Sequence, residues 1–314
     1  RWMPKRAHIS DHSLLIAGGA AGIAAAFNTP LGGVMFAIEE LSRKSDRRSN
    51  SLVLVAIVVA GLMGVSAYGN ASYFGIIRVE GFGSALIFPA VLVAICCGVA
   101  GGLFSRLLIV SLSGSSSDWF SKSRRNFPVI FAAGCGLAVA ILGVVSNGET
   151  YGSGYAHNRA MLENTNDTSS LYVLLKFVAT WLSTWSGVPA GVFAPSLAIG
   201  GALGNDIAQL TYYANAPTLI ALGMAGFLAA VTQAPLTAFI IVMEMVDGHG
   251  LVLSLMASAL VASGVSRLIS GPLYPSLAEL QLSRIRQWAA PSVKGAHAQA
   301  KPVHYSNANE SGSN

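Results

Sequence analysis

The segment over residues 186–195 has the composition of a helix break followed by a helix start. Its sequence, Ser-Gly-Val-Pro-Ala-Gly-Val-Phe-Ala-Pro, lies within the stretch 177–205, which carries no charged residue. The first turn of a helix leaves backbone N–H groups unpaired and carries about half a positive charge, so it can bind an anion without Lys or Arg. Gly191 would let the backbone approach an ion, and Pro195 fits a first turn. The alternative is a simple kink between two packed helices.

Two adjacent carboxylates, Glu39 and Glu40, close the uncharged stretch 13–38. A carboxylate at that depth in an apolar segment is costly, and it typically indicates a functional group such as a proton carrier. The alternative is an interfacial pair beside Arg43 and Lys44 whose side chains extend to water.

Tyr274 follows the last uncharged stretch, 250–266. Its hydroxyl can donate one hydrogen bond to an anion. A lone Tyr at the end of an apolar segment is also typical of the aromatic belt at a membrane boundary, so its role stays open from the residue alone.

Ser153 and His157 are the candidates for an enzymatic function, as nucleophile and base of an intramembrane hydrolase. The stretch 146–170 around them is rich in Gly, Asn and Thr, and we expect an irregular connection there. Nothing in the sequence fixes the geometry of the pair, so we predict that the protein is not an enzyme.

The composition indicates which kind of element must hold these residues. Of 314 residues, 53% are hydrophobic and only 11% charged, against roughly a quarter charged in a soluble domain, and the mean hydropathy is +0.57. A helix needs about 20 apolar residues to cross a bilayer. We predict an all-α, polytopic membrane protein, with more than one helix in the longest uncharged stretch. The uncharged stretches are 13–38, 49–77, 81–105, 126–148, 177–205, 207–243 and 250–266.

Basic residues gather between the uncharged stretches, and the net charge is +5. The positive-inside rule places such segments on the cytoplasmic side, and no soluble basic face exists that would bind nucleic acid. Neither a metal site nor a cofactor motif is predicted, because the three cysteines suit small core positions. The basic residues are Arg1, Lys5, Arg6, Arg43, Lys44, Arg47, Arg48, Lys122, Arg124, Arg125 and those from Arg284 on; the cysteines are Cys96, Cys97 and Cys135.

An internal repeat relates two distant parts of the chain. Residues 24–31 end in Pro-Leu and lead to Glu39, and residues 229–236 end in Pro-Leu and lead to Glu244, always 205 residues apart. In each copy a helix of small residues should break at the Pro, and a new helix should end in a carboxylate. Two unrelated Ala-rich helices sharing Pro-Leu by chance are the alternative.

Duplicated halves with interrupted helices are typical of secondary transporters, whose sites form at the broken helices. We therefore predict an inverted-repeat bundle of tilted and broken helices. Residues 1–83 would end a first membrane repeat, 84–290 would form the second, and 291–314 would be a disordered cytoplasmic tail.

Three ordered motifs resemble the CLC family of chloride channels and chloride/proton antiporters. They are the run 24–33 with its continuation to Glu40, the Gly-Val-Phe-Ala-Pro segment at 191–195, and Pro-Leu-Tyr at 272–274. The resemblance covers about residues 7–285.

The resemblance implies specific roles. The backbone N–H groups of Val192 and Phe193, beside Gly191, would bind the central chloride, and the Tyr274 hydroxyl would complete that site. Glu40, with Glu39 secondary, would transfer protons; channels of the family commonly carry an apolar residue there, so Glu40 favours a H⁺/Cl⁻ exchanger over the alternative, a passive chloride channel.

The resemblance also implies the surroundings of the protein. It would be a homodimer in a cell membrane, with chloride and protons as its substrates, the bilayer around it and no cofactor. Because the 314 residues contain no paired regulatory domains like those of eukaryotic members, we expect a prokaryotic inner membrane.

Two signature loops of the family, Gly-Ser-Gly-Ile-Pro and Gly-(Lys/Arg)-Glu-Gly-Pro with its gating glutamate, are absent from the chain. If the halves are equal, the first copy would begin roughly 120 residues before Arg1, and the partner of the helix start at 191–195 roughly 10–14 residues before it. We expect the gating loop there, and we expect the 314 residues alone to insert poorly and carry no selective chloride flux.

Overall fold

The structure is a computed structural model that describes residues 11–41, 50–69, 73–75, 84–114, 119–163, 170–213, 215–283 and 285. These residues form helices joined by turns, with no β-strand among them. The all-α prediction is thereby confirmed. The basic residues at 1–6 and 43–48, and the predicted tail at 291–314, lie outside the described residues.

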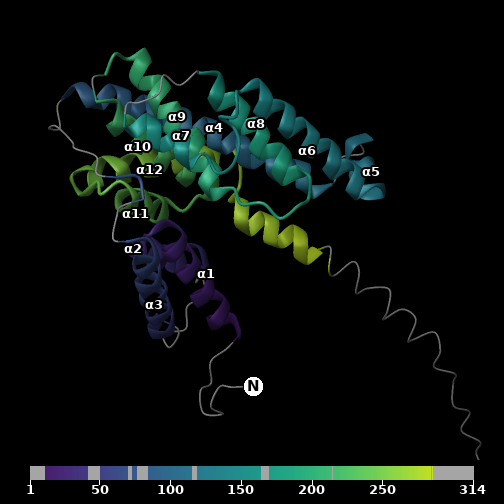
Figure 1. Ribbon diagram of the computed structural model, residues 1–314, viewed down its shortest axis with the longest axis horizontal. Helices are drawn as coiled ribbons and strands as arrows, with labels where there is room; N and C mark the ends of the chain where they lie inside the picture. The colour runs from purple at the N-terminus through teal and green to yellow at the C-terminus, as the bar shows by residue number, and fades with distance from the viewer. Residues whose placement is uncertain are drawn as a thin grey trace, which may run out of the picture.

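The first three helices form a small bundle that projects from the rest of the molecule (Figure 1). In it α1 packs along α3, and the short α2 continues into a π-helical turn, η1, that carries both glutamates. The bounds are α1 Asp11–Phe27, α2 Pro30–Phe36, η1 Ala37–Leu41 and α3 Asn50–Tyr68.

The remaining helices form the larger part of the molecule (Figure 1). They are η2 Ser84–Leu86, α4 Ile87–Ser113, α5 Trp119–Asn126, α6 Pro128–Val145, α7 Tyr155–Leu162, α8 Leu171–Trp185, α9 Phe193–Leu210, α10 Ala216–Thr232, α11 Pro235–Met245, η3 His249–Leu251 and α12 Val252–Ile269. A further helix covers residues 273–283.

Helix α10 lies at the centre of the core and packs against α4, α9, α11 and α12. Its side chains are almost fully buried, including Met224 and Phe227. Helices α9 and α10 cross so closely that a Cβ on Gly200 would collide with the Gly223 carbonyl oxygen. Small residues at such crossings let two apolar helices approach without a large side chain between them.

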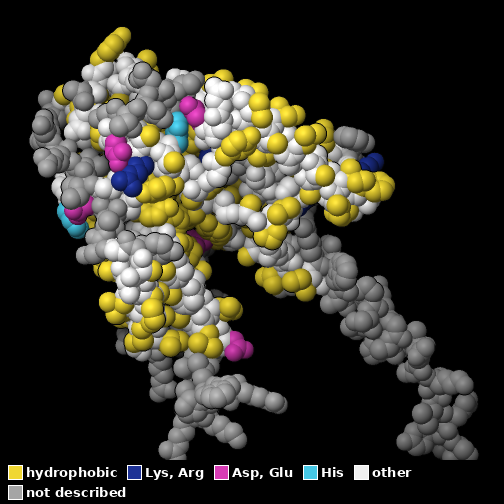
Figure 2. All heavy atoms as spheres, viewed as in Figure 1, with side chains coloured by type: hydrophobic (Ala, Val, Ile, Leu, Met, Phe, Trp, Pro, Cys, Tyr) yellow, Lys and Arg dark blue, Asp and Glu magenta, His cyan; other side chains and the backbone are white. Residues whose placement is uncertain are grey.

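Three described helices are long and apolar enough to cross a membrane: α4, α6 and the segment His249–Ile269. Large apolar side chains are exposed over much of the surface, and charged ones are few on the visible face (Figure 2). An apolar exterior of this kind suits lipid rather than water, since soluble proteins rarely expose large contiguous apolar patches. The polytopic membrane prediction is confirmed.

The two repeat copies break in the same way. Asn28 after α1 and Gln233 after α10 both adopt left-handed φ angles, 52° and 59°. The next residues, Thr29 and Ala234, have nearly identical angles, φ −126° and ψ 77° against φ −115° and ψ 76°. Proline then starts the following helix in each copy. The predicted helix breaks are therefore correct, and the stretch 207–243 does hold more than one helix.

The expectation of an irregular connection over 146–170 was wrong in part, because residues 155–162 form the helix α7. Gly154, with φ 86°, turns the chain into this helix. Four of its eight residues are buried, and it packs against α9. The polar composition of 146–170 gives no indication of these tertiary contacts. They stabilise α7, which is too short to be a stable helix on its own.

Candidate functional site: a helix N-terminus and two glutamates

The predicted helix start at 186–195 is present in the structure. Helix α8 ends at Trp185, Gly187 turns the chain with φ 86°, and α9 begins at Phe193 with Val192 as its N-cap. The Ser196 hydroxyl donates a hydrogen bond of 2.6 Å to the Val192 carbonyl oxygen, which fixes the first turn.

The amides proposed to bind an anion are available for it. Among the described residues, no acceptor pairs with the backbone N–H groups of Val192 and Phe193. Their side chains are buried, with 7% and 9% of their surface exposed, whereas Gly191 before them is exposed. The side chains thus anchor the helix start, and its positive end stays open to a ligand.

A cavity of about 210 Å³ adjoins this helix start. Gly191 and Pro195 line one side of it, and a Cβ added to Gly191 would meet nothing within 4 Å. Because about 10–15 Å³ of such volume holds one water, the cavity has room for an ion with part of its hydration shell. Its polar lining comes from Thr150, Lys176, Thr180, Ser183 and Thr184.

Lys176 is the charged residue of this cavity that sequence reasoning missed. It is 2% exposed, and its Nζ donates hydrogen bonds of 2.8 Å to the carbonyl oxygens of Thr150 and Gly152. An ammonium has three donors, so two carbonyls leave it one more. One feature of the sequence could have indicated its role: Lys176 is the only charged residue in α8. An ionisable residue within a membrane segment usually indicates a functional site.

Phe193 connects the helix start to the first sequence motif. Its ring packs against that of Phe27, the last residue of α1, with 5.1 Å between the ring centroids. Segments separated by more than 160 residues in the sequence are therefore held together in one apolar core.

Glu39 accepts two backbone hydrogen bonds from the other repeat. Its oxygens receive the N–H groups of Leu236 at 3.2 Å and Thr237 at 2.6 Å, in the first turn of α11. A carboxylate at a helix N-terminus satisfies unpaired donors and interacts favourably with the helix dipole. The structure thus gives Glu39 an anchoring contact.

Glu244 makes the matching contact in the opposite direction. Its oxygens receive the N–H groups of Leu31 at 3.1 Å and Gly32 at 2.7 Å, in the first turn of α2. Helices α2 and α11 therefore run antiparallel. Glu244, near the end of α11, caps α2, and Glu39, in the turn η1 that continues α2, caps α11. A Cβ on Gly32 would collide with Ile241, so only glycine allows this approach.

Glu40 and Tyr274 are brought together. Both side chains are half-buried, and the Glu40 carboxylate lies within electrostatic range of the Tyr274 phenol. Tyr274 is in the first turn of the helix over 273–283, next to the fully buried Leu273. The second glutamate of the first repeat is thus close enough to the C-terminal motif to interact with it electrostatically.

Ser153 and His157 do not form a catalytic pair. Ser153 is exposed and its Oγ accepts the Tyr155 N–H at 3.3 Å, whereas the His157 ring stacks on Tyr172 with 3.8 Å between centroids. No hydrogen bond joins the two side chains in the part of the chain that the structure describes.

The sequence and the fold both match known proteins. Residues 1–267 match the family described as voltage gated chloride channel. The H(+)/Cl(-) exchange transporter ClcA of Citrobacter koseri is 28% identical over 291 residues, which is 87% of this chain and 59% of that protein. The chain thus spans about three fifths of the length of the curated relatives it matches.

Solved structures of transporters share the fold. A CLC-type fluoride/proton antiporter aligns with a TM-score of 0.71 at 24% identity, over 84% of this chain and 65% of that one. A slow cyanobacterial Cl⁻/H⁺ antiporter aligns with a TM-score of 0.69 at 24% identity, over 87% and 66%. Because the family model matches most of its length, the chain belongs to the voltage gated chloride channel family, which is also called the CLC family.

Proposed function

We propose that this chain forms the chloride-binding and proton-transferring part of a H⁺/Cl⁻ exchanger. The observation that carries the proposal is the start of α9, where the Val192 and Phe193 amides lack partners among the described residues beside a cavity that holds Lys176. Chloride would accept hydrogen bonds from these amides, as anions do at helix N-termini.

This site would select anions by its positive electrostatic potential. Chloride would not need to form a direct ion pair with a side chain there. The helix end contributes about half a positive charge, and the Lys176 ammonium adds a full charge at the cavity wall. An ion held mainly by dipoles can leave again, which a transport site requires. The Tyr274 hydroxyl would provide a further donor.

Proton transfer would use Glu40. Its carboxylate can bind and release a proton, and it lies near the phenol proposed to contact chloride. Glu39, named as the secondary candidate, is already engaged by two backbone amides of α11, so we assign proton transfer to Glu40. The similarity to the exchanger from Citrobacter koseri supports exchange over a passive channel.

The assembly and location follow the same proposal. We propose a homodimer in the inner membrane of a prokaryote, with residues 1–83 ending one membrane repeat and 84–290 forming the next. The antiparallel pairing of α2 with α11 supports the two-repeat division. Exposed apolar side chains on α12, such as Leu253 and Leu268, offer a surface for lipid or a second copy.

The test is coupled flux in liposomes that contain the full-length protein and a chloride gradient, because the 314 residues alone are expected to carry no selective flux. An exchanger moves protons against their gradient when chloride runs down its own, and both ions are recorded together. Chloride flux without coupled proton movement would identify the alternative, a passive channel. Absence of selective chloride flux from the full-length protein would overturn both.

A further inference from the structure

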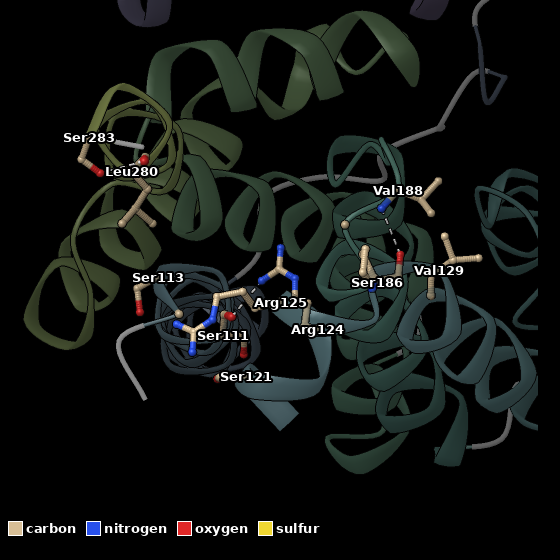
Figure 3. A pocket seen from close by; sticks show the side chains of 14 residues that line it. Ser111, Ser113, Ser121, Arg124, Arg125, Val129, Ser186, Val188, Leu280 and Ser283 are labelled. Atoms are coloured by element: carbon tan, nitrogen blue, oxygen red, sulfur yellow. Dashed lines mark hydrogen bonds between the residues drawn. The ribbon is translucent and has the colours of Figure 1, made fainter. Parts of the chain in front are cut away.

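A second pocket lies where four parts of the chain meet, and its described lining shares no residue with the cavity at the start of α9. It has a volume of about 990 Å³, and we call it the arginine pocket (Figure 3). It is formed by the end of α4, the junction of α5 and α6, the loop before α9, and the helix over 273–283. The described residues that line it are Ser111, Ser113, Gly114, Ser121, Arg124, Arg125, Pro128, Val129, Ala132, Ser186, Gly187, Val188, Leu280 and Ser283.

The described lining of the pocket is positively charged. Two of the lining residues that the structure describes are arginines, and none of them is Asp or Glu. Figure 3 shows Arg124 and Arg125 between the serines at the end of α4 and the loop that carries Ser186 and Val188. Both guanidinium groups thus contribute positive charge to one cavity.

The two arginines differ in how they are held. Arg124 is half-buried, and its Nη1 donates a hydrogen bond of 3.2 Å to the Ser111 carbonyl oxygen at the end of α4. Arg125 is exposed and makes no hydrogen bond or ion pair with the rest of the described chain. A guanidinium has five N–H donors, so Arg125 is the residue to bind a ligand, and Arg124 adds positive charge while it caps the end of α4.

The surroundings of the pocket are those of a membrane interface. Helix α6, one of the helices able to span a membrane, begins at Pro128 directly after the arginines. Trp181 and Trp185 donate their indole N–H groups to Ser111, at 3.0 Å and 3.2 Å. Tryptophan and arginine at the end of an apolar helix are typical of the lipid headgroup level.

An apolar surface continues from the pocket along α6. Val129 lines the pocket and is 79% exposed, and Ile130 beside it is 69% exposed. Val188 and Leu280 add apolar walls. A ligand that fits must therefore combine an anionic group for the arginines with an apolar part for these side chains.

We propose that the arginine pocket binds a phosphate ester, as presented by the headgroup of an anionic phospholipid. The guanidinium fork of Arg125 matches phosphate oxygens in pairs, and the volume exceeds what a small inorganic anion needs. Basic pockets between membrane helices recognise lipid headgroups by this chemistry.

The experiment measures quenching of tryptophan fluorescence in detergent micelles by lipids with brominated acyl chains. Trp181 and Trp185 lie beside the pocket, so a bound brominated lipid should quench them. We expect phosphatidylglycerol to bind more tightly than zwitterionic phosphatidylcholine. Arg125→Gln should weaken phosphatidylglycerol binding about tenfold, the value of one charge-assisted hydrogen bond, and Arg125→Lys should weaken it less.

Lys122→Gln is the matched control, because Lys122 is an exposed cation on the same helix that does not line the pocket. It should change the affinity less than twofold. If inorganic phosphate displaced the brominated lipid as strongly as unlabelled phosphatidylglycerol does, the natural ligand would be a soluble phosphate and not a lipid headgroup. Equal quenching by both lipids with no effect of phosphate, or an Arg125→Gln variant that binds like the wild type, would overturn the proposal.

Discussion

Glu39 and Glu244 each cap the helix that leads to the other. Glu244 accepts the amides that start α2, and Glu39, directly after α2, accepts the amides that start α11. Their oxygens lie 2.7 Å and 2.6 Å from the Gly32 and Thr237 nitrogens. These reciprocal caps join the two repeat copies at the helix break in each copy. Each break is therefore stabilised by the carboxylate of the other copy.

The first prediction concerns these reciprocal caps. Glu39→Ala and Glu244→Ala should each destabilise the protein by about 2 kcal/mol, because each removes the acceptor of two helix N–H groups. The free energy of unfolding in detergent micelles, from denaturant titration, gives the comparison. The two variants should lose similar amounts, since the two caps have matching geometry.

Glu163→Ala provides the reference for that measurement. Glu163 pairs with Arg159 at 2.9 Å, but both side chains are about half exposed. Such a pair contributes less than about 0.5 kcal/mol. A Glu39→Ala variant no less stable than Glu163→Ala would contradict an anchoring role for the reciprocal caps.

A second prediction concerns Gly191. The structure shows no collision for an added Cβ and no left-handed φ at this position, so Gly191→Val should fold normally. Chloride binding should still fall strongly, because the branched side chain would fill the space before the Val192 and Phe193 amides. Isothermal titration with chloride measures the change.

The control for Gly191 is Gly223→Ala, at the crossing of α9 and α10. A Cβ there would collide with the Gly200 carbonyl oxygen, so this variant should lose stability. Unchanged chloride affinity in Gly191→Val would place the anion elsewhere than at the start of α9.

A third prediction tests the buried lysine. Lys176→Met removes the positive charge from the cavity while keeping a similar length, and it should lower chloride affinity about tenfold. Lys176→Arg keeps the charge and should retain most of the affinity. If chloride bound equally well to Lys176→Met, the lysine would only tie the carbonyls of Thr150 and Gly152 to α8.

Much of the fold could be predicted because its signals are local. A proline such as Pro30 or Pro235 ends one helix and starts another whatever its tertiary surroundings. A long uncharged stretch likewise predicts a membrane-spanning helix. The helix start at Val192 was predictable for the same reason, since its glycines and prolines are encoded in one short segment.

The contacts between repeats were not predictable in the same way. The hydrogen bond from Leu31 to Glu244 spans 213 residues of sequence, and nothing near Glu39 indicates that α11 supplies its partners. Likewise the role of Lys176 depends on carbonyls 24 and 26 residues away. Tertiary contacts decide whether a carboxylate carries a proton or caps a helix.

The most direct measurement is paired chloride and proton flux in liposomes for Glu40→Gln in the full-length protein. The amide cannot titrate, so we predict that chloride flux persists and chloride-driven proton movement is lost. Glu163→Gln, an exposed carboxylate far along the chain, should keep both fluxes. Proton movement at the wild-type rate in Glu40→Gln would contradict the account.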